Sequence, residues 1–288
     1  MLIRLGVAAL WLLRFLPASI LARIGRGAGM LMYYSGAKPR RVAHANIELC
    51  FPELSKERRR QLLVRHFQAF GRSLLEYGIL WWSSQERIQR LVKIRGIEYW
   101  QSLGARPVIW LAPHFVGLDA GGARLATEFH AVSTYGRQHH AVLDSLLMHG
   151  RTRFGTAILL SRRQSARQVI KLMREGRPFY YLPDQDLGPR FSIFVPFFGI
   201  PAATVTGLSR IVRLTGAAVV PCITRQLAEG YEVQFYPAWQ DFPGATEEAD
   251  ARRMNAFIEE RIREMPEQYF WTHKRFRTRP EGEPSLYR

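Results

Sequence analysis

Only two of the 288 residues are cysteines, Cys50 and Cys222, and 24 residues are acidic against 41 that are basic. Two cysteines cannot form a disulfide framework, and they lack the paired spacing of a zinc site, so a reduced compartment fits best. The shortage of acidic residues leaves a formal net charge of +17. This surplus implies an anionic partner, which is nucleic acid, an anionic lipid or an acidic carrier protein; a merely basic soluble protein is the plain alternative.

Long apolar runs are also missing, because no stretch reaches the ~18–20 residues of a clean membrane-spanning helix. Residues 5–13 are apolar but lie between Arg4 and Arg14, and residues 15–22 contain a proline. A third apolar stretch, 27–34, ends at two tyrosines. Arginine side chains near such segments can extend to the interface, so both a tilted anchor and a helix in the membrane plane stay open.

Basic residues follow this N-terminal region directly, at Lys38, Arg40 and Arg41. The positive-inside rule places them, with the rest of the chain, on the cytoplasmic side of a membrane. We therefore predict a membrane-anchoring helical segment over residues 1–35 and a cytoplasmic α/β domain over residues 36–288. We also expect the second to fold without the first.

Apolar runs alternate with amphipathic stretches along the rest of the chain. A long helix is predicted to open at Ser55. Strands are predicted at residues 107–112, 130–135, 178–182, 218–224 and 231–236, and helices at 118–128, 140–154, 165–175, 203–215 and 247–264. This alternation predicts an α/β fold with a central, mostly parallel sheet flanked by helices and with sites at the carboxyl ends of the strands.

The first of these strands leads into His114-Phe-Val-Gly-Leu-Asp119, where a helix is predicted to begin. A neutral imidazole can accept a proton from a hydroxyl near pH 7. A nearby carboxylate can fix its tautomer and stabilise the imidazolium. His114 is therefore a candidate general base with Asp119 as its orienting carboxylate, and helix capping is the alternative role for such a pair.

Arg137 follows the second predicted strand, and Arg151 and Arg153 lie on the helix predicted after it. Guanidinium groups there suit phosphate or oxyanion contacts, and a solvated basic face is equally consistent. The adjacent pair His139-His140 with Asp144 is only a weak candidate metal site, because such a short polar cluster in a loop is not specific.

Two carboxylates, Asp184 and Asp186, follow the strand at 178–182, at the same predicted sheet edge as His114. The aromatic run 194–199 comes next, between prolines. We interpret it as a loop, which covers an apolar substrate at least as readily as it fills the core. Basic and aromatic residues then mix in the segment 271–280. Without a nucleic-acid-binding motif, this mixture favours a phospholipid headgroup plane over nucleic acid.

Taken in order, these motifs resemble those of the lipid A biosynthesis acyltransferases of the lauroyl and myristoyl type. These late acyltransferases of lipopolysaccharide assembly belong to the glycerolipid acyltransferase superfamily. The similarity lies in His-x4-Asp, Arg-x-Arg-Phe-Gly, Pro-Asp-Gln-Asp-x-Gly, Phe-Val-Pro-Phe-Phe-Gly with Ala-x-Thr, and Trp-x-His-Lys-Arg-Phe-x-Thr-Arg-Pro. The first motif marks the superfamily alone, whereas the boxes at Asp184–Asp186 and Trp271–Pro280 are specific to the family.

The resemblance implies an inner-membrane enzyme whose catalytic domain faces the cytoplasm. It implies transfer of a fatty acyl chain from acyl carrier protein, an acidic partner, to a hydroxyl of an acylated glucosamine-disaccharide lipid A precursor. Neither a metal nor another cofactor is expected, since the thioester supplies the driving force, and no nucleic acid is expected as a partner. The implied catalytic residues are His114 as base, Asp119 as its orienting carboxylate and Arg151 as oxyanion donor. The implied substrate-binding residues are Arg137, Arg153, Asp184, Asp186, Phe197, Phe198, Thr204, Lys274, Arg275 and Arg277.

Two other functions stay open at this point. A related acyltransferase that acts on a lysophospholipid or a mannosylated lipid would share His114 and Asp119. A basic membrane scaffold that has lost activity is the alternative outside enzymes, but the presence of His114, Asp119, Arg151 and Asp184 together argues against it. The length of the donor chain depends on the depth of an apolar pocket.

Overall fold

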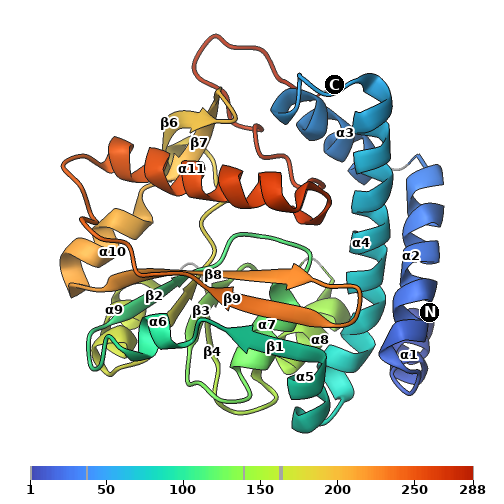
Figure 1. Ribbon diagram of the computed structural model, residues 1–288. Coiled ribbons are helices and arrows are strands. Elements are labelled where there is room, and N and C mark those ends of the chain that lie inside the picture. The colour runs from blue at the N-terminus through green and yellow to red at the C-terminus, as the bar shows by residue number, and fades with distance from the viewer. Residues whose placement is uncertain (1, 37, 139, 162–164, 288) are drawn as a thin grey trace.

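A mixed seven-stranded sheet lies at the centre of the computed structural model, which describes residues 2–36, 38–138, 140–161 and 165–287 (Figure 1). The strand order is β1-β9-β8-β2-β5-β3-β4, and β6 and β7 form a separate hairpin. The strands are β1 (Val92–Arg95), β2 (Val108–Leu111), β3 (Val132–Tyr135), β4 (Ile158–Ser161), β5 (Phe179–Tyr181), β6 (Ser192–Phe197), β7 (Ile200–Val205), β8 (Ala218–Gln226) and β9 (Tyr231–Phe235).

The central sheet is mostly parallel, as predicted. Strands β8, β2, β5, β3 and β4 run in one direction, while β9 is antiparallel to β8 and β1 is parallel to β9. The five predicted strands correspond to β2, β3, β5, β8 and β9, which confirms them. Strands β1 and β4 at the two sheet edges are additional to the prediction.

Helices cover both faces of this sheet, with α11 on one side and α7, α8 and α5 on the other (Figure 1). The helices are α1 (Leu2–Leu13), α2 (Ala18–Tyr34), α3 (Lys38–Cys50), α4 (Lys56–Trp82), α5 (Gln85–Leu91), α6 (Glu98–Gln101), α7 (Leu118–Leu125), α8 (Ala141–Thr152), α9 (Ser165–Arg174), α10 (Gly207–Thr215) and α11 (Glu247–Glu264). Strand β2 shows why two layers are needed. Its residues Ile109 and Leu111 belong to one apolar cluster, and Val108 and Trp110 to the other, because successive side chains point to opposite faces.

The long helix α4 begins where the sequence predicts. The hydroxyl of Ser55 accepts a hydrogen bond from the backbone N–H of Arg58, which caps the first turn. Figure 1 shows α4 standing between the sheet on one side and α1 and α2 on the other.

The backbones of α2 and α4 approach each other closely. An added Cβ at Gly29 would lie 2.0 Å from the backbone oxygen of Phe67, so only glycine allows this approach. The side chains of Leu21 and Tyr33 are buried in the two apolar clusters. Helix α2 therefore contributes to the core, and the expectation that residues 36–288 fold without residues 1–35 stays a prediction. Within the described ranges, no helix combines the length and the apolar character that crossing a membrane requires.

A buried ion pair within α4 is hydrogen-bonded to the β8–β9 hairpin. Arg72 Nε lies 2.9 Å from Glu76 Oε1, and both side chains are almost fully buried. Arg72 also donates hydrogen bonds to the carbonyl oxygens of Leu227 and Gly230, and the Tyr231 hydroxyl donates a hydrogen bond to the Glu76 carboxylate. These bonds compensate for the loss of water around both charges.

The aromatic run near residue 195 forms strand β6 and not the predicted loop. Val195 and Phe197 are buried on one face of the β6–β7 hairpin, and Pro196 pairs with Pro201 across it. Prolines fit here because a two-stranded hairpin has two free edges, where a missing N–H breaks no ladder. Since β7 extends to Val205, the helix predicted at 203–215 begins only at Gly207.

Candidate active site

A cleft of about 440 Å³, open to solvent, lies where β2, β3 and β5 end. His114 follows β2, Arg137 follows β3, and Asp119 and Arg151 enter from α7 and α8. Helix α4 and the segment around Phe270 close the other side. The carboxyl ends of parallel strands therefore form the site, as this class of fold predicts.

His114 is held by Asp184, which lies just beyond β5, the neighbour of β2 in the sheet. Asp184 Oδ1 is 2.7 Å from His114 Nδ1, and its Oδ2 accepts the backbone N–H of His114 at 2.9 Å. Burial disfavours the charged form of Asp184, but the His114 ring and these hydrogen bonds outweigh it and lower the pKa of the carboxyl. An ionised carboxylate can only accept, so Nδ1 carries the proton and Nε2 has the free lone pair.

Asp119 does not make the predicted hydrogen bond that orients His114. Its Oδ1 accepts from Arg151 Nε at 2.7 Å and its Oδ2 from the Tyr77 hydroxyl at 2.5 Å. Burial opposes ionisation of Asp119, but Arg151 dominates and holds the pKa of the carboxyl below its usual value. The two carboxylates differ because they lie on different elements. Asp184 lies just beyond β5, the strand beside β2, whereas Asp119 lies on α7, which faces α4 and α8.

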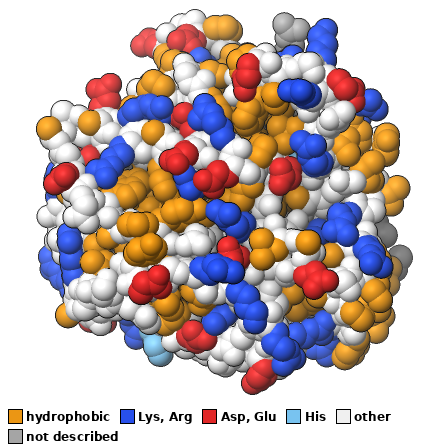
Figure 2. Space-filling model, viewed as in Figure 1, with side chains coloured by type: hydrophobic (Ala, Val, Ile, Leu, Met, Phe, Trp, Pro, Cys, Tyr) orange, Lys and Arg blue, Asp and Glu red, His pale blue; other side chains and the backbone are white. Residues whose placement is uncertain are grey.

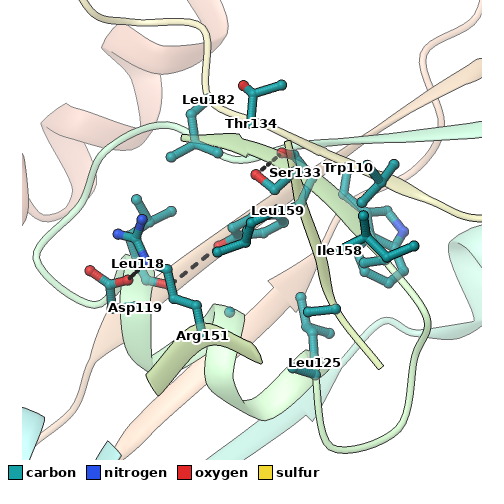
Figure 3. A pocket seen from close by; sticks show the side chains of 16 residues that line it. Trp110, Leu118, Asp119, Leu125, Ser133, Thr134, Arg151, Ile158, Leu159 and Leu182 are labelled. Carbon is teal, nitrogen blue, oxygen red and sulfur yellow. Dashed lines mark hydrogen bonds and ion pairs between the residues drawn. The ribbon is translucent and has the colours of Figure 1, made fainter. Parts of the chain in front are cut away.

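A narrow apolar pocket with a volume of about 70 Å³ adjoins the cleft, and Asp119 and Arg151 line both. Figure 3 shows these two side chains on one side of the pocket and Trp110 and Ile158 on the other. The remaining lining residues include Leu118, Gly122, Leu125, Ala126, Ala131, Val132, Ala157, Leu159 and Leu182. The pocket thus offers a polar entrance and an apolar interior, which suits a ligand with a reactive head and a hydrocarbon tail.

Residues 1–278 match the sequence model of a family described as bacterial lipid A biosynthesis acyltransferase. The chain belongs to this family.

Three curated relatives from Escherichia coli (strain K12) match over nearly the whole chain. The lipid A biosynthesis lauroyltransferase is 35% identical over 98% of this chain and 94% of its own length. The palmitoleoyltransferase is 31% identical over 98% of this chain and 93% of its own length. The myristoyltransferase is 33% identical over 99% of this chain and 89% of its own length. The resemblance noted in the motifs is confirmed.

The two further arginines of this family member differ in surroundings. Arg137 lines the cleft, with a side chain that is 82% exposed and lies 3.7 Å from Asp144. Arg153 donates to the backbone oxygen of Leu80 at 3.0 Å, and its guanidinium lies 4.0 Å from the centre of the Phe154 ring. The structure therefore brings Arg137 to the site, whereas Arg153 joins α8 to α4.

Asp186 holds the C-terminal family box against the strand ends. It accepts hydrogen bonds from the backbone N–H and the hydroxyl of Thr278, and Arg277 lies 3.6 Å away. The backbone N–H of Asp186 in turn donates to His273 Nε2 at 3.0 Å. Burial lowers the pKa of His273 to about 4, so the ring stays neutral and can accept.

The other predicted substrate-binding residues lie outside the cleft lining. Arg275 is buried and donates to the backbone oxygen of Ala203 and to Thr204 Oγ1, and its guanidinium lies over the Phe197 ring. Phe198 contacts the guanidinium of Arg263, and Lys274 lies over the ring of Tyr287. The placement of Arg275, Thr204 and Phe197 fits a structural role in the hairpin.

Two features of the site went unnoticed in the sequence. Tyr77 lies on α4, 42 positions before its partner Asp119, and the only available signal was its place on an amphipathic helix. The Phe270 ring stacks near His114, with 6.3 Å between ring centres.

The weak candidate metal site at His139, His140 and Asp144 falls partly outside the described residues, since His139 is one of the residues not described. Among the described residues, no cluster of three or more potential metal ligands occurs.

Proposed function

We propose that this family member transfers a fatty acyl chain from the thioester of acyl carrier protein to a hydroxyl of an acylated glucosamine-disaccharide lipid A precursor. The observation that carries the proposal is that His114 and Arg151 line one cleft, which adjoins an apolar pocket. The names of the relatives support the reaction, since each is a fatty acyltransferase of lipid A biosynthesis.

In the proposed mechanism, His114 Nε2 accepts the proton of the acceptor hydroxyl as its oxygen attacks the thioester carbonyl carbon. Asp184 keeps Nδ1 protonated and stabilises the imidazolium that forms. When the tetrahedral intermediate collapses, the carbon–sulfur bond breaks, and the proton on His114 passes to the departing thiolate. One histidine therefore serves as base and then as acid, and the ester and the free thiol are the products.

Arg151 is proposed to stabilise the oxyanion of that intermediate. Asp119 binds its Nε, which leaves the two terminal nitrogens of the guanidinium for other partners. A preorganised donor of this kind is worth about 2.7–4 kcal/mol in the transition state. The carboxylate that we predicted to orient His114 thus orients the arginine in this mechanism.

The apolar pocket is proposed to bind the hydrocarbon chain of the donor. In this arrangement the thioester carbonyl would lie beside the guanidinium at the entrance, and the chain would extend along the apolar lining towards Leu125 and Ile158. Small residues such as Ala126 and Ala157 leave the room for the chain. The depth of the pocket would then set the preferred chain length.

Membrane attachment at the cytoplasmic face of the inner membrane is proposed to use the outer surfaces of α1 and α2. Large apolar side chains are exposed on these helices and in the turn between them, among them Leu12, Phe15 and Leu31. Figure 2 shows apolar side chains at the surface on the side where these helices lie, with Lys and Arg among them. Helices of this kind lie in the interface plane, and the net charge of +17 would favour both anionic lipid and an acidic carrier protein.

Mass spectrometry of lipid A from a deletion strain tests the reaction. The wild-type gene should restore one missing acyl chain, and His114→Ala should not. His130→Ala is the matched control, because His130 is an exposed histidine outside the cleft lining. Full restoration by both His114→Ala and Asp119→Ala would refute the proposed mechanism.

An assay of the purified protein with two acceptors tests the substrate class. Acylation of glycerol phosphates but not of the disaccharide lipid would refute the proposed acceptor.

Flotation with lipid vesicles tests the attachment. The triple variant Leu12→Gln, Phe15→Gln, Leu31→Gln should stay with the soluble fraction, while the wild type floats with vesicles that contain anionic lipid. Equal flotation of both proteins would contradict the proposed surface.

A further inference from the structure

Tyr77 lies outside the motifs that mark the family, yet it contacts the polar cluster of the site. Its hydroxyl donates to Asp119 Oδ2 at 2.5 Å, while Arg151 Nε donates to Asp119 Oδ1 at 2.7 Å. The two oxygens of one carboxylate are thus bound from two different helices, α4 and α8. Bonds at both oxygens restrict rotation of a carboxylate about its terminal torsion, which is otherwise broad.

Helix α4 also fixes the backbone of α8 on both sides of Arg151. Gly150 precedes it, and an added Cβ there would lie 1.9 Å from Trp81 Cδ1. The Trp81 ring lies 4.7 Å from that of Tyr77, one turn earlier on α4. Beyond Arg151, Arg153 Nε donates to a backbone oxygen of α4 at 3.0 Å. Tyr77 therefore projects from a surface that already holds the arginine's helix in place.

The charges in this cluster favour the same geometry. Burial raises the pKa of the Tyr77 phenol well above its usual value, and the neighbouring charge of Asp119 raises it further. The phenol therefore keeps its proton and can donate it in a hydrogen bond. Asp119 carries the negative charge of the cluster and Arg151 the positive charge.

We propose that Tyr77 is a positioning residue which, through Asp119, sets the direction of the Arg151 guanidinium in the cleft. The inference rests on the proposed function, in which Arg151 meets the oxyanion. Without the hydroxyl, the Asp119 carboxylate can turn and the guanidinium turns with it. Stabilisation of the developing negative charge then weakens more than substrate binding does, because the charge exists only in the transition state.

Steady-state kinetics of Tyr77→Phe test this role. We expect kcat to fall by about tenfold with little change in KM, since a hydrogen bond to a charged group is lost. The acid limb of the pH profile should move to higher pH, because Asp119 loses a donor that helps to keep it ionised. The matched control is Tyr231→Phe, which removes a hydrogen bond from a tyrosine hydroxyl to the carboxylate of Glu76, the neighbour of Tyr77 on α4. This variant should leave kcat and the pH profile unchanged.

A double-mutant cycle with Asp119→Asn separates positioning from general stability. If Tyr77 acts through Asp119, then Tyr77→Phe should cause no further loss of kcat in the Asp119→Asn background. The same fold-loss in both backgrounds, or wild-type kcat in Tyr77→Phe alone, would overturn the proposal.

A measurement without turnover keeps this test independent of the reaction. In NMR spectra of isotope-labelled protein, the Arg151 Nε–H should exchange slowly with water in the wild type and in Tyr231→Phe, and faster in Tyr77→Phe. If the wild type transfers no acyl chain, the proposed function fails, and this exchange rate alone decides the role of Tyr77. An unchanged rate in Tyr77→Phe would then refute it.

Discussion

Replacing Gly27 or Gly29 in α2 should reveal whether this helix belongs to the folded core. At Gly29 an added methyl group would lie 2.0 Å from the Phe67 oxygen, while at Gly27 nothing lies within 4 Å. Alanine favours a helix over glycine by about 0.5–1 kcal/mol at either position. Overpacking costs about 1–3 kcal/mol, and the upper end applies here because backbone atoms cannot rotate away.

The expected effects therefore have opposite signs. Gly27→Ala should stabilise the protein by about 0.5–1 kcal/mol. Gly29→Ala should destabilise it by about 2 kcal/mol, which is the overpacking cost less the gain in helix propensity. In a chain of this size, the second change lowers Tm by roughly 4–8 °C.

Thermal unfolding of both purified variants and the wild type in the same detergent, followed by circular dichroism, gives the comparison. Guanidinium unfolding then provides the free energies at one temperature. A similar rise in Tm for both variants would show that α2 does not pack on α4. The segment before residue 36 would then not contribute to the folded core.

Three further results are expected. Asp184→Asn should lower kcat for acyl transfer by about 10³–10⁴-fold with an unchanged circular dichroism spectrum, because an amide no longer holds the required His114 tautomer; activity within tenfold of wild type would contradict this role. Ala126→Phe should shift the donor preference to shorter chains, measured as kcat/KM over a series of acyl carrier protein thioesters, and an unchanged preference would remove the pocket from consideration. Burial lowers the pKa of His66 to about 4, and the same holds for His273. The unfolded chain therefore binds more protons between pH 6.5 and 4, so the free energy of unfolding should fall as the pH falls through this window, by up to about 1.4 kcal/mol per pH unit for each histidine. When the free energy of unfolding is measured by urea unfolding at several pH values, it should depend less steeply on pH in His66→Gln than in the wild type. The same pH dependence in both proteins would refute the low pKa of His66.

The sequence predicts strands such as β2 and β8 readily, because they are buried along nearly their whole length and carry apolar residues on both faces. It predicts the edges poorly. Strand β1 carries Lys93 and Arg95 on its exposed positions, which hides a four-residue strand directly after a helix. The β6–β7 hairpin was missed because Pro196 and Pro201 argue against a strand, although proline is harmless at a free edge.

Four polar residues of the candidate site, His114, Asp119, Arg151 and Asp184, could be found from the sequence, but not their pairing, and Tyr77 and Phe270 could not be found. His114, Asp119 and Asp184 all stand near strand ends, and spacing along the chain favours the near carboxylate over the one 70 positions away. Which carboxylate meets the ring depends on which strands are neighbours, and β5 lies beside β2. Strand order is a property of the whole chain, so local motifs cannot supply it.

The buried pair of Arg72 and Glu76 restricts how this sequence can change over time. Removing one partner of a buried ion pair leaves a charge without compensation, at a cost of about 3–5 kcal/mol, whereas replacing both with apolar residues of similar volume is often neutral. A lineage that changes either residue alone must therefore pass through an intermediate whose free energy of unfolding is lower by this amount. The two positions should consequently change together, with Tyr231 following them because its hydroxyl would lose its acceptor.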